Sequence, residues 1–304
     1  MSESMSRAVA FVGLGNIGAP MAMRVVTHSG RPTIVWNRTR ERTAALAAGG
    51  AQVAPDLRFV GGNADVISLC VSDARALEDV LFGAEGLAHA LRPDHLIVDH
   101  STISPGDTRA LAQRIHESSG ARWVDAPVSG GPSGAAAGTL AVFAGGSADD
   151  VERAMPVLRA FAGRVTHMGP LGAGQTTKAC NQLINVGTLT VVAEALVLAS
   201  KAGLDPYRLP AALAGGFADS NILRNYATRL LDGSYSGVGK TATTLKDLGI
   251  VLQIGREADA ALPVISLLEG LLRTIVNRGF TQDGMTGMMR LYADQPIARS
   301  EPGG

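Results

Sequence analysis

Short apolar runs alternate with longer stretches of mixed polarity over the first 169 residues, and this alternation predicts strands connected by helices. The expected strands cover residues 8–12, 33–36, 64–71, 96–99, 122–125, 140–144 and 164–168. Helices are expected directly after the first strand and over 39–48 and 149–160. Because such alternation is typical of doubly wound parallel sheets, we expect an α/β domain over residues 1–169.

The pattern changes at a glycine-rich segment, residues 169–174, after which strand patterns stop. Residues 175–201 are apolar almost all round the helix that they predict, so we expect one long buried helix. Further helices are expected over 206–214, 220–231, 243–257, 263–278 and 284–292. The second domain, residues 170–304, is therefore expected to be all-α.

The composition narrows the class of protein. Apolar residues make up 46% and charged residues 18% of the 304, which argues against a disordered chain. The formal net charge of zero argues against nucleic-acid binding. Two cysteines suit a reducing cytoplasm, and residues 1–7 lack the apolar core of a targeting segment. The uncharged stretch after Lys178 contains amide side chains, so we expect a buried helix and no membrane span.

A Gly-x-Gly-x-x-Gly pattern directly follows the first strand, and it suits a dinucleotide-binding turn. Gly13 permits a tight strand-to-helix turn, Gly15 lets the backbone approach a pyrophosphate, and Gly18 allows close helix packing. The free N–H groups at the start of the helix would face the phosphates. The candidate cofactor residues here are Gly13, Leu14, Gly15, Asn16, Ile17 and Gly18. The alternative is an ordinary strand–helix turn.

The tip of the second strand carries Asn37, Arg38 and Thr39, where NAD-binding units usually place a carboxylate. Arg38 can pair with a 2′-phosphate, and Asn37 and Thr39 can add hydrogen bonds. A charge-assisted hydrogen bond contributes about 1.5–3 kcal/mol, which favours NADP over NAD by roughly tenfold to a hundredfold. The alternative is that Arg38 is a solvated arginine at the start of the next helix.

Further candidates follow other strands. Ligands of doubly wound sheets lie at the carboxyl ends of the strands, so Val71, Ser72 and Thr102 are expected on the cofactor side. His100 is also at a strand end, but a lone histidine there is more often structural, and we do not assign it to the site. The segment after residue 125 is expected to be a tight, ordered loop whose Ser129, Gly130 and Gly131 could hold a carboxylate. The alternative is a turn-rich connector.

Lys178 is the main candidate for proton transfer. It lies in the first turns of an apolar helix, and burial there would lower its pKa towards neutrality. Asn181 and Gln182 follow by three and four residues, so all three share one helix face. The alternative is a lysine that reaches out to solvent beside surface amides. Lys246 and Asp247, taken alone, form an exposed charge pair.

Four segments in order resemble the β-hydroxyacid dehydrogenase family: residues 11–22, 125–131, 174–182 and 245–248. The family includes 3-hydroxyisobutyrate dehydrogenase, tartronate semialdehyde reductase and succinic-semialdehyde/glyoxylate reductases. The resemblance spans nearly the whole chain. It implies a Rossmann-like domain, an all-α domain joined to it by a long interdomain helix, and a homodimer or homotetramer buried through the helical part.

The resemblance also implies residue roles. Lys178 matches the catalytic lysine, and the loop of Ser129, Gly130 and Gly131 matches the segment that binds the substrate carboxylate. Asn181 and Gln182 match the amides that orient the substrate, although the second is often Asn in the family.

Thr102 and Lys246 match residues that contact the nicotinamide cofactor, and Asp247 matches a family-typical acid to which we give a structural role. The family usually has Met or Ser at the position of His100, a departure that bears on substrate fit.

The sequence therefore predicts an NADP(H)-dependent oxidoreductase that interconverts a small β-hydroxyacid and its semialdehyde, with no metal site. Three alternatives stay open. An imine reductase usually has Asp or Tyr in place of Lys178, and a decarboxylating sugar-acid dehydrogenase has His in place of Asn181. The third is a cofactor-sensing module without turnover. Phe217, Asn221 and Leu223 are candidates for lining the substrate pocket, but their spacing does not single them out.

Overall fold

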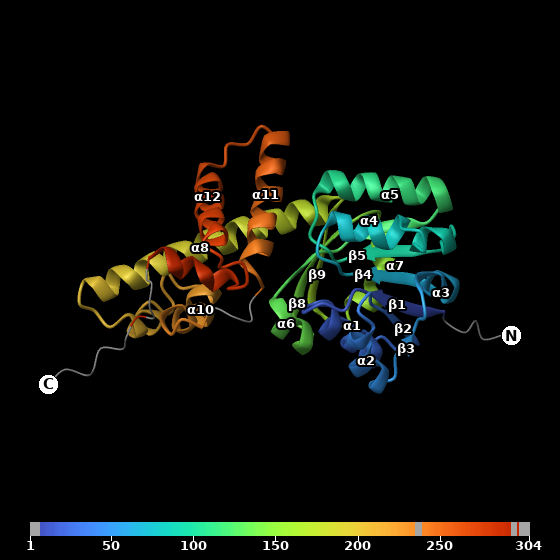
Figure 1. Cartoon of the computed structure of the whole chain (residues 1–304), viewed down its shortest axis with the longest axis horizontal. Helices are drawn as coiled ribbons and strands as arrows, with labels where there is room; N and C mark the ends of the chain where they lie inside the picture. The colour runs from blue at the N-terminus through green and yellow to red at the C-terminus, as the bar shows by residue number, and fades with distance from the viewer. Residues whose placement is uncertain (1–6, 235–238, 293–296, 298–304) are drawn as a thin grey trace. The chain divides into compact units, whose positions relative to one another are not determined.

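The computed structural model describes residues 7–234, 239–292 and 297 (Figure 1). Contacts within the chain divide it into two compact units, residues 1–178 and 179–304, and the division falls inside one long helix. Residues 1–6, for which the sequence predicts no targeting segment, lie outside the described residues.

The first unit is built on a mainly parallel sheet. Its strands are β1 (Ala8–Val12), β2 (Thr33–Trp36), β3 (Gln52–Val53), β4 (Ala64–Leu69), β5 (Leu96–Asp99), β6 (Arg122–Asp125), β7 (Val128–Ser129), β8 (Leu140–Gly145) and β9 (Ala162–Gly169). Within the described residues the order is β3-β2-β1-β4-β5-β6-β8-β7, and β9 also pairs with β8. Neighbouring strands from β3 to β6 are parallel, whereas β8 is antiparallel to β6 and β7. The predicted doubly wound α/β fold is confirmed.

Helical segments connect these strands. They are α1 (Gly18–His28), η1 (Arg40–Thr43), α2 (Ala44–Ala48), α3 (Leu57–Asn63), α4 (Ala74–Phe82), η2 (Leu87–Ala90), α5 (Pro105–Ser119), α6 (Gly131–Ala137) and α7 (Ala148–Leu158). Neither α4 nor α5 is among the helices that the sequence predicts, yet both begin at a capping side chain. Asp73 accepts a hydrogen bond from Ala76 N, and Ser104 accepts one from Asp107 N. Those caps are the sequence signals that mark the two helices.

The prediction of a loop after residue 125 is wrong in part, because β7 and α6 form there. Gly130 and Gly131 adopt φ angles of +131° and +65°, which let the chain turn sharply out of β7. Pro132 then lies in the first turn of α6, where its missing N–H costs no helix hydrogen bond. The high density of glycine thus belongs to a turn and a short helix.

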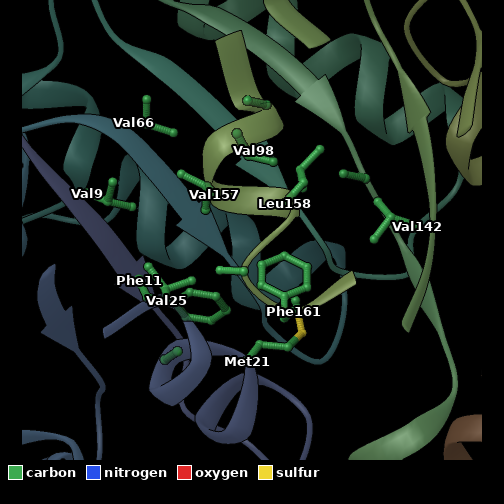
Figure 2. Close-up of a cluster of buried hydrophobic side chains, with 14 of the residues drawn as sticks. Val9, Phe11, Met21, Val25, Val66, Val98, Val142, Val157, Leu158 and Phe161 are labelled. Carbon is green, nitrogen blue, oxygen red and sulfur yellow. The ribbon is translucent and has the colours of Figure 1, made fainter. Parts of the chain in front are cut away.

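The core of the first unit lies on both faces of the sheet, since alternate residues of β1 belong to two different apolar clusters. Val9 and Phe11 belong to the cluster that includes Met21 and Val25 of α1 and Phe161, as Figure 2 shows. Ala10 and Val12 pack into the second cluster with Ile67 and other residues. A strand buried on both faces gives the continuous apolar run seen in the sequence.

The second unit is helical, as predicted. It contains most of α8 (Ala173–Lys201), and then η3 (Pro206–Arg208), α9 (Leu209–Ala212), α10 (Asn221–Leu231), α11 (Thr241–Glu257), α12 (Pro263–Asn277) and η4 (Met285–Leu291). The last of these is a 3₁₀ helix within the range where the sequence predicts an α-helix. Two apolar clusters hold the unit, one between α8 and α10 and one between α8, α11 and α12.

Helix α8 is less buried than the sequence predicts. Leu189, Ala193 and Leu196 are buried, but Ile184, Val191 and Leu198 are 62%, 59% and 70% exposed. By length and composition alone α8 could cross a membrane, with a mean hydropathy of 1.8 over its most apolar 18 residues. Core helices of soluble proteins have the same property, and 39% of that window is buried inside the protein.

Candidate active site

In the glycine-rich turn after β1, two glycines are packed tightly against neighbouring backbone and the third faces open space. A Cβ at Gly13 (φ +95°) would lie 2.3 Å from the Cys70 carbonyl oxygen, and a Cβ at Gly18 would lie 2.1 Å from that of Gly13. At Gly15, by contrast, a Cβ would meet no described atom within 4 Å. The turn therefore fits the roles expected of its three glycines: two allow close packing, and the third leaves room for a phosphate group against the backbone.

Asn37 braces this turn from the end of β2. Its Oδ1 accepts a hydrogen bond of 2.8 Å from Leu14 N, and its Nδ2 donates one of 2.8 Å to Thr39 O. The Leu14 side chain is buried, so Leu14 contributes to the turn through its backbone. Arg42, which the sequence pattern does not mark as a candidate, donates a hydrogen bond of 3.3 Å to Leu14 O.

A cavity of about 200 Å³ lies at the carboxyl ends of β2 and β3. It is lined by Trp36, Asn37, Arg38, Arg40, Thr43, Val53, Ala54 and Pro55. Arg38 was expected there, whereas Arg40 was not, because it lies beyond the strand tip in η1. Two exposed guanidinium groups beside one cavity are suited to a phosphate ester.

The ends of β4 and β5 are joined by a short contact. Val71 N donates a hydrogen bond of 3.0 Å to Ser101 Oγ, which places Val71 beside the segment that carries Thr102. The Ser72 hydroxyl donates to the Asp73 carboxylate at 2.8 Å, at the start of α4.

His100 belongs to the core. Its Nδ1 lies 2.9 Å from the Ala126 carbonyl oxygen and its Nε2 lies 3.2 Å from Ser68 Oγ. Because a carbonyl oxygen only accepts, the proton is on Nδ1, and Nε2 accepts from the hydroxyl. Burial lowers the pKa of His100 to about 4. The ring also stacks on Phe11, with 5.9 Å between centroids. A neutral, packed imidazole suits the structural role expected for His100.

Lys178 lies beside the loop expected to bind a carboxylate. Its Nζ donates a hydrogen bond of 2.9 Å to the carbonyl oxygen of Val128 in β7. Ser129 is the next residue of the same strand and pairs with Ala141 of β8. The first unit thus brings together Lys178 and the Ser129–Gly131 turn, which are about fifty residues apart in sequence.

A chain of side-chain contacts in the second unit joins the two amides to an acid. Asn181 Nδ2 donates to Gln182 Oε1 at 3.0 Å, and Gln182 Nε2 donates to Asp247 Oδ2 at 2.7 Å. Asp247 Oδ1 forms an ion pair of 3.2 Å with Lys246 Nζ. Asp247 is only 6% exposed, so the prediction that this charge pair is exposed is wrong for the acid. The buried carboxylate accepts a hydrogen bond from Gln182.

Phe217 is fully exposed, whereas Leu223 packs into the core between α8 and α10. Among the described residues, no group of three or more histidine, cysteine or acidic side chains is arranged to hold a metal ion.

Two family models match the chain. The NAD-binding domain of 6-phosphogluconate dehydrogenase matches residues 8–169, and the NAD-binding model of NADP-dependent 3-hydroxyisobutyrate dehydrogenase matches residues 172–292. Together they cover nearly all of the described sequence.

Individual relatives and solved structures also match this chain over nearly its whole length. The 2-hydroxy-3-oxopropionate reductase of Escherichia coli is 36% identical over 95% of this chain and 99% of its own. A crystal structure of 3-hydroxyisobutyrate dehydrogenase from Salmonella typhimurium has a TM-score of 0.85 at 29% identity, covering 94% and 100% of the two chains. An imine reductase from Pseudomonas sp. is 21% identical with a TM-score of 0.61, covering 94% and 99%, a likeness of fold alone.

Proposed function

The chain belongs to the β-hydroxyacid dehydrogenase family, and on that premise we propose that it interconverts a short β-hydroxyacid and its semialdehyde with NADP(H). Family membership makes it an NAD(P)-dependent hydroxyacid dehydrogenase of the 3-hydroxyisobutyrate dehydrogenase and 2-hydroxy-3-oxopropionate reductase type. The substrates that we propose resemble 3-hydroxyisobutyrate, tartronate semialdehyde or succinic semialdehyde. We propose that residues 1–169 form the NADP-binding domain, which also carries the Ser129–Gly131 turn, and that residues 170–304 form the substrate and oligomerisation domain.

NADP is the cofactor that we propose over NAD. The open backbone at Gly15 suits the pyrophosphate, and the cavity beside Arg38 and Arg40 suits the phosphorylated ribose. Asn37 holds the glycine-rich turn in place, so its contribution is to the shape of the site. We keep the cofactor-binding roles expected from the sequence for the remaining candidates, which are Asn16, Ile17, Thr39, Val71, Ser72, Thr102 and Lys246.

Lys178 is the proposed general acid and base, while the nicotinamide supplies or accepts the hydride. In oxidation Lys178 takes the proton of the substrate hydroxyl. In reduction its ammonium polarises the carbonyl group and then protonates the forming alkoxide. The hydrogen bond to Val128 holds the ammonium next to the turn that receives the substrate, which lowers the cost of orientation.

Ser129, Gly130 and Gly131 are proposed to bind the substrate carboxylate, and Asn181 to orient the reacting oxygen. Both polar atoms of the Gln182 amide are engaged, Nε2 by Asp247 and Oε1 by Asn181. We therefore assign Gln182 an indirect role in substrate binding: it fixes which way the Asn181 amide faces.

A homodimer or homotetramer is proposed for the assembly. Ile184, Val191 and Leu198 lie seven residues apart on α8 and form one exposed apolar stripe. Such a stripe is suited to packing against a second helix. We propose that the protein is cytoplasmic, and burial against another copy of this chain would then explain the apolar character of α8.

The observation that carries the proposal is the placement of Lys178 Nζ on the carbonyl of Val128, directly before Ser129. The test is NADPH and NADH oxidation by the purified protein with glyoxylate, with tartronate, methylmalonate and succinic semialdehydes, and with cyclic imines. NADPH-dependent turnover of one of these acids supports the proposal. Turnover of cyclic imines alone, or tight NADPH binding without any turnover, would contradict it in favour of an imine reductase or a sensor.

A further inference from the structure

The side chain of Gln175 is enclosed in the first unit and bonded at both of its polar atoms. It is 1% exposed. Nε2 donates a hydrogen bond of 2.7 Å to Ser101 O, and Oε1 accepts one of 3.3 Å from Ile103 N. The two backbone groups flank Thr102, so one amide holds the segment that carries Thr102 from both sides.

Asp125, at the end of β6, holds the first turn of α8. Its carboxylate accepts hydrogen bonds from Gly172 N at 2.7 Å and from Gln175 N at 2.8 Å. These N–H groups lie at the start of the helix, where no preceding turn of α8 can satisfy them. The backbone of Gln175 is therefore fixed to β6, while its side chain is fixed to the segment after β5.

The packing around this turn leaves little space for adjustment. A Cβ at Gly174 would lie 2.3 Å from the carbonyl oxygen of Phe143, and a Cβ at Gly145 would lie 2.4 Å from Asp125 Oδ1. Close backbone packing of this kind transmits a displacement instead of absorbing it.

Lys178 follows Gln175 by three residues, which is about one helical turn. We propose that Gln175 is a positioning residue that fixes Lys178 and the Thr102 segment relative to one another. The inference rests on the proposed function, because it assigns Lys178 to proton transfer and Thr102 to the cofactor. Loss of the two hydrogen bonds of the Gln175 amide removes this side-chain link between the Thr102 segment and the helix turn that carries Lys178.

The test replaces Gln175 with methionine, which has nearly the same shape but neither hydrogen bond. The rate constant for oxidation of bound NADPH by the semialdehyde acid that the wild type reduces is measured in a single turnover. This constant does not depend on the fraction of folded enzyme. We expect Q175M to slow it by about tenfold to a hundredfold, the scale of a misplacement of about 1 Å. The dissociation constant for NADPH should stay within about threefold, because the glycine-rich turn is unchanged.

Two further variants complete the design. Q113M removes an exposed glutamine that bonds Glu117 on α5, and it should behave as the wild type. Q175N keeps the amide but draws it back by one methylene, and it should also slow the single turnover. It serves as the test variant if Q175M does not fold. A wild-type rate constant in the Gln175 variants, with only the amplitude reduced, would show a purely structural role and overturn the inference. Absence of Lys178-dependent turnover in the wild type would overturn the proposed function and this inference together.

Discussion

Lys178 Nζ donates a hydrogen bond of 2.9 Å to the carbonyl oxygen of Val128, the residue before Ser129. An ammonium carries three donors, so a backbone contact can fix its position and still permit proton transfer. This contact connects the proposed acid and base to the turn proposed to bind the substrate.

Replacing Lys178 with arginine separates charge from proton transfer. A guanidinium can still donate to Val128 O, but it keeps its proton at all working pH values. We expect K178R to lower kcat for hydroxyacid oxidation by roughly a hundredfold or more, the scale of lost general base catalysis. Steady-state kinetics check this, and K178R turnover within threefold of wild type would show that a fixed positive charge is sufficient.

Two glycines of the cofactor turn should respond differently to alanine. In G15A the new methyl group meets no described atom, so the Tm should stay within about 1 °C while NADPH binding weakens by about tenfold, or ~1.4 kcal/mol. In G18A the methyl group meets the backbone of Gly13, which should cost about 1–3 kcal/mol of stability. Thermal melts and NADPH titrations distinguish the two, and equal effects of both variants would contradict the account of this turn.

Arg38 should determine the preference between the two cofactors. R38Q removes the proposed partner of the 2′-phosphate, so kcat/KM with NADPH should fall by roughly tenfold to a hundredfold while the value with NADH changes little. The matched control is R58Q, an exposed arginine of α3 that does not line the cavity. Parallel losses with both cofactors would indicate that Arg38 does not contact the 2′-phosphate.

Asp247 should stabilise the second unit by accepting from Gln182. In D247L the buried Gln182 amide loses its acceptor, which should cost about 1–3 kcal/mol. D247N keeps an acceptor oxygen and should retain most of the stability. Urea denaturation measures both, and an equal loss in the two variants would mean that the charge of Asp247, paired with Lys246, is what matters.

The buried, neutral ring of His100 should make the folded protein less stable in acid. Its pKa is about 4 in the folded protein, against an ordinary value near 6.5, so the unfolded chain binds the proton more readily. Stability from the neutral ring is complete above pH 6.5 and is lost as the pH falls towards 4. Between pH 7 and pH 5 the loss should be about 2 kcal/mol. H100Q should reduce this dependence and H116Q, on the exposed face of α5, should not; identical pH profiles would refute the assignment.

Much of the fold could be predicted from local pattern. Buried parallel strands such as β1 and β5 are apolar on both faces, so they appear as continuous runs. Helix α5 has sparse apolar positions, whereas α4 is amphipathic, and the capping residues Ser104 and Asp73 mark where the two helices start. The exposed stripe of α8 could not be predicted, because a helix apolar all round gives no sign of which face is covered.

The site was predictable where a motif fixes the backbone and unpredictable where a contact joins distant residues. The roles of Gly13 and Gly18 follow from the spacing of the turn. The link from Gln175 to Ser101 and the link from Gln182 to Asp247 join residues 74 and 65 positions apart. Such contacts depend on the tertiary fold, and no local pattern indicates them.

The most direct test of the central claim compares wild-type protein with K178A in NADPH oxidation driven by a short semialdehyde acid, with NADPH binding measured in parallel. Loss of the Lys178 amine should lower kcat by roughly a hundredfold or more and leave the dissociation constant for NADPH nearly unchanged. Wild-type turnover by K178A would remove Lys178 from proton transfer and contradict the account.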